Sequence, residues 1–292
     1  MLLGLGSPLL YRADSHFGYF PKENQHLRRF FVEIDTNPFG MRSNPIGATK
    51  APGEYRILFV GDSVPFGTTY VDQKAIFVEQ IAARLRGNGI APRVQVLNAS
   101  APGWAPSNEL EFLRARGLYD ADMVVLVYNT KDLTQPFAPY HDSPEFPLQD
   151  PPTAIGELWS RYLQPHVFHR TVSDPGSTEI DGPPSFDDAQ RVLLTAEATR
   201  QLVSSQGRRL VVLYCPAVTA DVHRYQSAWD KVLLDVKSWA SQHSVPLLDM
   251  TGVLTARDAK QVYFDGIHLR QTGDKLVADA FVEWTNAEVI RH

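Results

Sequence analysis

Short apolar runs alternate with longer segments of helical periodicity from residue 55 to the end of the chain. The runs contain few polar positions, which is typical of strands that are buried on both faces of a parallel sheet. The five predicted strands are Tyr55–Val60, Arg93–Asn98, Met123–Tyr128, Leu210–Cys215 and Val245–Met250. Such strands, separated by helices, indicate an α/β fold with a five-stranded, mainly parallel sheet covered by helices on both faces.

Apolar residues recur at helical spacing in the segments between these strands. In the last segment the stripe consists of Leu276, Val277, Ala280, Phe281 and Trp284. The predicted helices are Gln73–Arg86, Ser107–Leu118, Ser185–Gln206, Ala228–Gln242 and Thr272–Ala287. One-sided stripes of this kind are expected of helices that lie on a sheet.

Residues 1–52 do not follow the alternation. Turn-forming sequences such as Asn37–Gly40 and Ser43–Gly47 interrupt them, and no long helical period is present. We predict an N-terminal extension (1–52) that packs on a main domain (53–292). The apolar start of the chain lacks the basic region and cleavage site of a secretory signal, so it is either the trimmed end of an upstream anchor or a packing strand.

Residues 129–184 form a long insertion that is rich in proline and aromatic residues. Loops this long in a compact domain usually carry function or move. Two interpretations stay open. The insertion either overhangs the carboxyl ends of the strands, where ligands bind in such sheets, or it is a mobile surface loop.

Charge and hydropathy exclude several classes of protein. The 292 residues carry 28 Lys and Arg against 33 Asp and Glu, which gives a formal net charge of −5 and argues against a nucleic-acid partner. No apolar run approaches the ~18 residues that a membrane span needs. The single cysteine, Cys215, lies in a predicted strand and is expected in the core, and it leaves the cellular compartment open.

Candidate chemistry begins at Gly61-Asp-Ser63, directly after the first predicted strand of the sheet. A serine on a tight strand-to-helix turn can present its hydroxyl at the carboxyl edge of the sheet, where the helix N-terminus favours negative charge. A serine at this place can equally be a simple N-cap.

A possible partner for Ser63 lies just before the last predicted helix. In Asp265-Gly-Ile-His268 a carboxylate three residues ahead of an imidazole can orient the ring and stabilise its protonated form. A solvated surface loop is the alternative. Gly103 and Asn129 follow the second and third predicted strands of the sheet and could supply a backbone and a side-chain donor to the same crevice. Because all these positions fall at strand carboxyl ends, we expect one active site.

These segments resemble the SGNH (GDSL-type) serine hydrolases. The nucleophile block of that family is similar to Phe59-Val-Gly-Asp-Ser63, its glycine block to Leu97-Asn-Ala-Ser-Ala-Pro-Gly103, and its last block to Asp265-Gly-Ile-His268. Upstream, His16-Phe-Gly-Tyr19 and Asn37-Pro-Phe-Gly-Met-Arg42 resemble a bacterial subgroup with an N-terminal extension. The resemblance implies a flavodoxin-like three-layer α/β/α fold. It leaves the cellular location open between the bacterial cytoplasm and the cell envelope.

The third block departs from the family pattern. The family has an Asn-Asp pair at the end of the third strand, whereas this chain reads Tyr128-Asn-Thr-Lys-Asp132. Aligned on Asp132, the expected asparagine falls on Lys131; aligned on the strand end, it falls on Asn129. We prefer Asn129, because a neutral amide donor is what the block supplies. A lysine at this position, among the groups that bind the oxyanion of the reaction, would lower the basicity of a nearby His268.

Further candidates are weaker. Trp104 could line an acyl or sugar pocket, or pack in the core. Arg42 is a possible anion contact, and Lys131 a possible substrate contact. His166 and His169 have a spacing that could bind a metal on a helix, but no third ligand accompanies them, so no metal site is expected.

The resemblance implies a serine esterase with Ser63 as nucleophile, His268 as base and Asp265 as its orienting acid. Ser63, Gly103 and Asn129 would form the oxyanion hole, with no cofactor. The expected substrate is a small-molecule or carbohydrate ester, with O-acetyl groups a fair expectation. Alternatives are an O-acyltransferase with the same triad, a non-catalytic binding module with an impaired oxyanion hole, and a phosphate or nucleotide binder at the Gly61–Ser63 turn.

Overall fold

The structure is a computed structural model that describes residues 4–47, 49–86, 93–141, 143–164 and 182–289. Its centre is a five-stranded parallel sheet in the order β6–β5–β7–β8–β9. The strands are β5 (Glu54–Gly61), β6 (Arg93–Ser100), β7 (Met123–Asn129), β8 (Arg209–Cys215) and β9 (Leu247–Asp249). All pairs are parallel, as the apolar runs predict.

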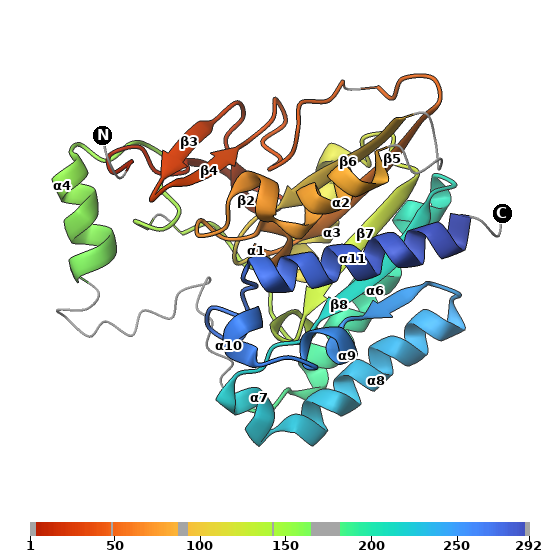
Figure 1. The fold of residues 1–292 in the computed structure, drawn as a ribbon. Helices are drawn as coiled ribbons and strands as arrows, with labels where there is room; N and C mark the ends of the chain where they lie inside the picture. Colours follow the sequence, from red (N-terminus) through yellow and green to blue (C-terminus); the bar gives the residue numbers. More distant parts are fainter. Residues whose placement is uncertain (1–3, 48, 87–92, 142, 165–181, 290–292) are drawn as a thin grey trace.

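Helices cover both faces of this sheet (Figure 1). On one face α2 (Phe77–Leu85) packs against α11 (Gln271–Val289). On the other, α3 (Pro106–Arg116) contacts α6 (Phe186–Ser205), which in turn contacts α8 (Gln226–Gln242). The predicted three-layer α/β/α fold is confirmed.

Short elements carry the connections between strands and helices. They are α1 (Ser63–Phe66), η1 (Gln73–Ala75), η2 (Lys131–Leu133), α7 (Ala220–Arg224), α9 (Thr251–Leu254) and α10 (Ala259–Val262). Within the 129–184 insertion, α4 (Ala154–Glu157) continues into a π-helical turn, η3 (Leu158–Leu163). Residues 165–181 of the insertion lie outside the described residues.

The N-terminal extension folds into two antiparallel hairpins that the turn-rich sequence does not predict. β1 (Tyr11–Asp14) pairs with β2 (Gly18–Pro21), and β3 (His26–Arg29) pairs with β4 (Val32–Asp35). Phe17 and Phe20 of the first hairpin are fully buried and belong to the same apolar core as the central sheet. The hairpin therefore contributes to the core of the main domain.

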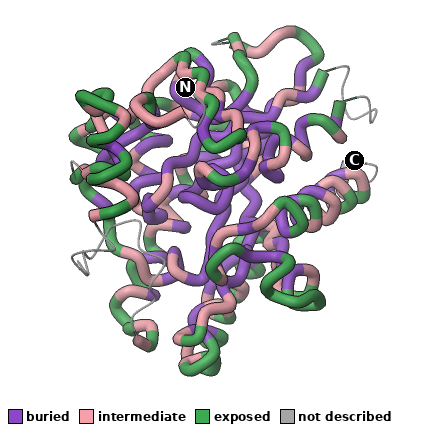
Figure 2. Tube along the Cα trace, turned by 60° about the vertical axis from the view of Figure 1, so that its left-hand side comes forward, coloured by how far each residue is buried: buried purple, intermediate pink, exposed green. Residues whose placement is uncertain are grey.

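Burial is concentrated in the sheet, where the tube is purple almost throughout the centre (Figure 2). All seven residues of β7 are buried, since the strand has neighbours on both edges and helices on both faces. Such a strand must be apolar on both sides, which is why its sequence shows no alternation.

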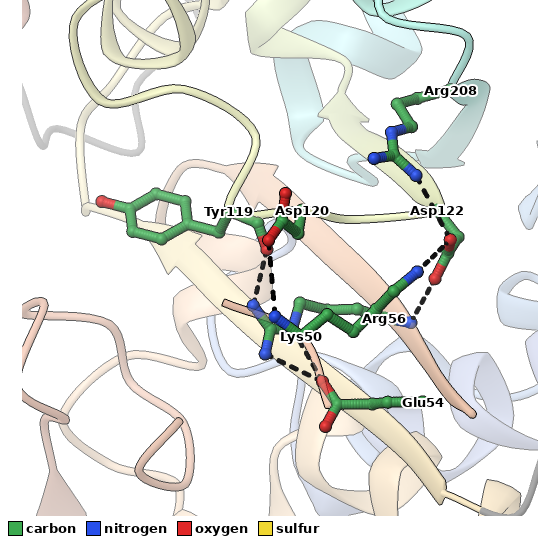
Figure 3. A network of polar contacts seen from close by, with 7 residues as sticks. All are labelled: Lys50, Glu54, Arg56, Tyr119, Asp120, Asp122 and Arg208. Atoms are coloured by element: carbon green, nitrogen blue, oxygen red, sulfur yellow. Dashed lines mark hydrogen bonds and ion pairs between the residues drawn. The ribbon is translucent and has the colours of Figure 1, made fainter. Parts of the chain in front are cut away.

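A network of charged residues closes the amino-terminal edge of the sheet (Figure 3). The Arg56 guanidinium is fully buried and forms an ion pair with Glu54 at 2.8 Å. Asp122 accepts a hydrogen bond from the Arg56 backbone N–H at 2.8 Å and pairs with Lys50 at 2.5 Å and Arg208 at 3.4 Å. These charges lie at the end of β5 opposite to Ser63, so they support the sheet and not the site.

Candidate active site

Ser63 is placed by the sharp turn from β5 into α1. A Cβ on Gly61 would lie 2.6 Å from Cγ of Pro65 and 3.0 Å from the carbonyl oxygen of Val127, so only glycine fits there. Asp62 is the N-cap of α1, and its Oδ1 accepts a hydrogen bond from Val64 N–H at 2.8 Å. Ser63 is thus the first residue of the helix and not its cap, which leaves its hydroxyl available for other partners.

Those partners come from the far end of the sequence. Nε2 of His268 lies 2.8 Å from Oγ of Ser63, although 205 residues separate them. On the other side of the ring, Nδ1 lies 2.7 Å from Oδ2 of Asp265. This pairing assigns the Nδ1–H tautomer, because Nδ1 must donate to the carboxylate while Nε2 accepts from the serine. The structure brings the three residues into one hydrogen-bonded chain.

Asp265 also shapes the turn that carries the histidine. Its Oδ1 accepts hydrogen bonds from the N–H groups of Ile267 at 3.0 Å and His268 at 2.9 Å. Partial burial opposes ionisation of Asp265, but these hydrogen bonds and the one from the imidazole outweigh it and lower its pKa to about 2. The carboxyl is therefore ionised, as an orienting partner for a protonated histidine must be.

Asn129 ends β7 beside the nucleophile. Its side chain is buried, and Nδ2 donates to Oδ2 of Asp62 at 2.9 Å, the same oxygen that lies 3.2 Å from Oγ of Ser63. Oδ1 of Asn129 accepts from the backbone N–H of Lys131 at 2.7 Å. The amide is held from both ends, with its donor turned towards Asp62.

Gly103 lies in the turn after β6 and has a φ of +81°. A glycine adopts this conformation without strain. In the part of the chain that the structure describes, no hydrogen bond uses the backbone N–H of Gly103 or of Ser63. Two backbone donors at the carboxyl edge of the sheet are therefore available to a ligand.

Three buried carboxyl groups lie behind the site, and sequence reasoning did not single them out as a cluster. They are Asp62, Asp132 and Glu109, and burial raises the pKa of each, with charge repulsion inside the group adding to the rise for Asp132 and Glu109. Oδ2 of Asp132 accepts from the backbone N–H of Asn129 at 2.7 Å. Both oxygens of Glu109 and Oδ1 of Asp132 have no partner among the described residues. The cluster therefore favours bound protons over full ionisation.

The interpretation of Trp104 as a pocket residue is wrong. Trp104 is fully buried, and its ring stacks on Phe20 with centroids 5.3 Å apart. Its Nε1 donates to the carbonyl oxygen of Tyr19 at 2.9 Å. The indole therefore joins the first hairpin to the sheet domain and has no face for a ligand.

Arg42 is also structural, and its interpretation as an anion contact is wrong. The side chain is fully buried and donates to the carbonyl oxygens of Phe66 at 2.8 Å and Val71 at 2.7 Å, and to Oε1 of Gln73 at 3.1 Å. Burial lowers its pKa to about 10, which still leaves it charged at neutral pH. It fixes the segment after α1 to the N-terminal extension.

The remaining candidates are placed as follows. Cys215 is buried in β8, where burial raises the pKa of its thiol, in agreement with a core position. His166 and His169 lie outside the described residues. Among the residues that are described, no group of three or more His, Cys, Asp or Glu side chains could hold a metal ion. None of the described helices is long and apolar enough to cross a membrane.

Comparison with known proteins gives a likeness of structure. No protein-family model matches the chain, and no curated protein matches it significantly. A lipolytic protein of the G-D-S-L family from Veillonella parvula superposes with a TM-score of 0.52 at 14% identity, over 78% of this chain and 97% of that one. The chain has the SGNH hydrolase fold.

Two further solved structures support the same fold. A lipase/acylhydrolase from Enterococcus faecalis matches with a TM-score of 0.50 at 16% identity, over 80% of this chain and 96% of that chain. A catalytic variant of an acetylxylan esterase from Geobacillus stearothermophilus matches with a TM-score of 0.50 at 13% identity, over 78% and 93%. In this chain the sheet order places its switch point between β5 and β7, next to Ser63 and Asn129.

Proposed function

We propose that the chain is an SGNH-type serine esterase that hydrolyses acyl esters, with O-acetyl groups on carbohydrate as the preferred class. The observation that carries the proposal is the continuous chain from Ser63 Oγ through His268 to Asp265, with distances of 2.8 and 2.7 Å. A serine, an imidazole and a carboxylate in this order form an activated nucleophile on any fold.

The reaction follows from this order of groups. Oγ of Ser63 attacks the ester carbonyl carbon while Nε2 of His268 takes the hydroxyl proton. The imidazolium, stabilised by Asp265, then gives this proton to the departing alcohol as the tetrahedral intermediate collapses to an acyl-enzyme. Water, deprotonated by the same nitrogen, attacks the acyl carbon, and the carboxylic acid leaves as Ser63 recovers its proton.

The oxyanion of the tetrahedral intermediate needs donors in place before the reaction. We assign the backbone N–H groups of Ser63 and Gly103 and the carboxamide of Asn129 to this role, with one such donor typically worth about 3–4 kcal/mol. The hydrogen bond from Lys131 N–H to Oδ1 of Asn129 supports Asn129 over Lys131, since it leaves the amide donor facing Asp62, whose carboxyl also neighbours the serine. Asp62 holds Nδ2 until the oxyanion forms.

Substrate class is argued from two observations. One of the solved structures with this fold is an acetylxylan esterase, whose substrate is an O-acetyl group on a glycan. Phe264, directly before Asp265, and Tyr70 are exposed aromatic side chains in one groove with the exposed amides of Gln261 and Gln271, a lining that suits a sugar better than a long acyl chain. The proposal therefore commits to short acyl groups.

Labelling with a fluorophosphonate tests the proposal directly. The purified wild type should gain one adduct, mapped to Ser63 by peptide mass, and Ser63→Ala and His268→Ala should gain none. Ser204→Ala, which removes an exposed hydroxyl on α6, is the matched control and should label like the wild type. A folded wild type without an adduct would reject catalysis and favour a binding module.

A further inference from the structure

We propose that a groove lined by Tyr70 and by Phe264, the residue directly before Asp265, binds the glycan chain that carries the ester. The groove encloses about 620 Å³, and its walls include Tyr70, Phe264, Arg270, Gln261 and Gln271. We call this surface the Tyr70 groove. The inference rests on the proposed esterase and names its substrate as an oligosaccharide or polysaccharide ester, held by several sugar units and not by the acyl group alone.

Part of the Tyr70 groove comes from the two segments that carry the triad, and the rest comes from β4, η1, α2, α10 and α11. Ser63 begins α1, and Tyr70 lies on the segment that follows this helix. On the same segment Thr68, directly after Gly67, has a positive φ of +53°. Phe264 directly precedes Asp265, and its backbone N–H donates to the carbonyl oxygen of His268 at 2.9 Å. A chain bound in the groove is thus held by the segments that fix the nucleophile and its base.

Two aromatic rings make the apolar part of the groove. Tyr70 is 64% exposed and Phe264 is 39% exposed, although large aromatic side chains are normally buried. Their ring centroids lie 6.0 Å apart at 55°, so the rings form one bent surface. The Arg270 guanidinium lies 4.4 Å from the centre of the Phe264 ring and fixes it in place. A fixed, exposed aromatic surface suits the C–H face of a pyranose ring.

The other walls are polar. Gln261 and Gln271 are exposed, and each amide offers both donors and an acceptor, which is what a sugar hydroxyl requires. Lys74 and Arg270 add charged donors. A long acyl chain in this groove would remove water from those amides and cations without replacing their hydrogen bonds, which is unfavourable. Aromatic surface together with amide groups therefore selects carbohydrate over lipid.

Kinetics on esters of different size test this assignment. For Tyr70→Ala we expect KM for an acetylated xylo-oligosaccharide to rise about tenfold, because a central aromatic contact is lost. The kcat/KM for 4-nitrophenyl acetate, which is too small to reach the groove, should stay within about twofold of the wild type. Tyr70→Phe keeps the ring and should restore KM. Leu234→Ala removes an exposed apolar side chain from α8 and should change neither value.

Direct binding separates this inference from the esterase proposal. Nuclear magnetic resonance titration of wild type and Tyr70→Ala with unacetylated xylo-, cello-, chito- and galacturono-oligosaccharides reports binding whether or not the triad is active. Binding of any of them by the wild type, weakened in Tyr70→Ala, supports the groove. If the wild type labels at Ser63 yet binds none of these chains, or if Tyr70→Ala leaves KM unchanged, the groove is rejected and the esterase stands. If Ser63 does not label but the chains bind, the groove stands alone.

Discussion

Oδ2 of Asp62 lies 3.2 Å from Oγ of Ser63, so the nucleophile has a buried carboxyl neighbour in addition to its histidine. The same oxygen accepts a hydrogen bond from Nδ2 of Asn129 at 2.9 Å. Asp62 thereby positions two groups of the proposed reaction without being a member of the triad. It also caps α1, which fixes the backbone of the nucleophile.

Substituting Asp62→Asn tests this positioning role. The new side chain can still cap α1 through its oxygen, but its amide would face the amide of Asn129, and two donors cannot bond to each other. We expect Asn129 to turn away, kcat on a small ester to fall about 10- to 100-fold, and KM to change little. A purely structural role would instead lower the thermal midpoint and leave kcat per folded molecule unchanged, which differential scanning fluorimetry beside active-site titration would reveal.

The third block of the site is tested by comparing Asn129→Ala with Lys131→Ala. Loss of one preorganised donor to an oxyanion lowers kcat by about 10²- to 10³-fold. We expect that loss for Asn129→Ala and less than about threefold for Lys131→Ala, measured as kcat on 4-nitrophenyl acetate. The reverse order would assign the hole to Lys131 and overturn the alignment of this block on the strand end.

Acid stability should depend on Asp265. Its pKa in the fold is about 2, below the value of roughly 3.9 in an unfolded chain, so its ionised form stabilises the fold. That contribution is fully present above pH ~4 and is lost as the pH falls through about 2. Urea unfolding of the wild type and Asp265→Asn between pH 2 and 5 should show a smaller loss of stability with acid in the variant. If the free energy of unfolding fell equally steeply with acid in both proteins, the carboxyl would not be held ionised by His268.

Much of the fold could be predicted because parallel strands that are buried on both faces have apolar sequences without alternation. Met123–Asn129 has no alternation and is buried at every position. The first hairpin could not be predicted in the same way. Its strands have four residues each, and Phe17 and Phe20 are buried by Trp104, which lies far along the chain. Contacts of that kind depend on tertiary structure and leave no local period.

The residues of the site likewise differ in whether the local sequence predicts their role. Ser63 follows from its place at the end of a predicted strand, since carboxyl ends of parallel strands meet at one edge. Asp265 and His268 follow from their spacing just before the last predicted helix. Glu109 gave no comparable signal. It looks like an ordinary helix residue near the start of α3, and only the arrangement of the helix on the sheet buries both of its oxygens. The hydrogen bonds of Asp62 likewise require the folded geometry.

Glu109 provides a test of the buried acid cluster. Burial raises the pKa of Glu109 well above its ordinary value, so the fold binds this proton more tightly than the unfolded chain does. Stability from this group is present at low pH and is lost as the pH rises above the unfolded value of roughly 4.3. Glu109→Gln keeps the shape and removes the titration. We expect the free energy of unfolding of the variant, measured with urea, to rise relative to that of the wild type between pH 5 and 8. A difference between the two proteins that stays constant across that range would contradict this.

The amino-terminal edge of the sheet offers a change that should affect stability and leave the chemistry intact. In Arg56→Met, the buried Glu54 carboxylate loses its ion pair and the carbonyl oxygen of Tyr119 loses a hydrogen bond of 2.7 Å. An unpaired buried charge costs about 3–5 kcal/mol. We expect a loss of that size in urea unfolding, with kcat per folded molecule unchanged, because Arg56 lies at the opposite end of β5 from Ser63.

The double variant Arg56→Met/Glu54→Gln separates lost charge pairing from lost shape. It removes the orphaned carboxylate while keeping the volume of both side chains similar. If the unpaired charge causes the instability, the double variant recovers a large part of the lost free energy, since buried ion pairs are often replaceable by neutral residues. If it unfolds as readily as Arg56→Met, the contribution of Arg56 comes instead from its hydrogen bonds to backbone carbonyls, and its partner Glu54 matters little to the sheet.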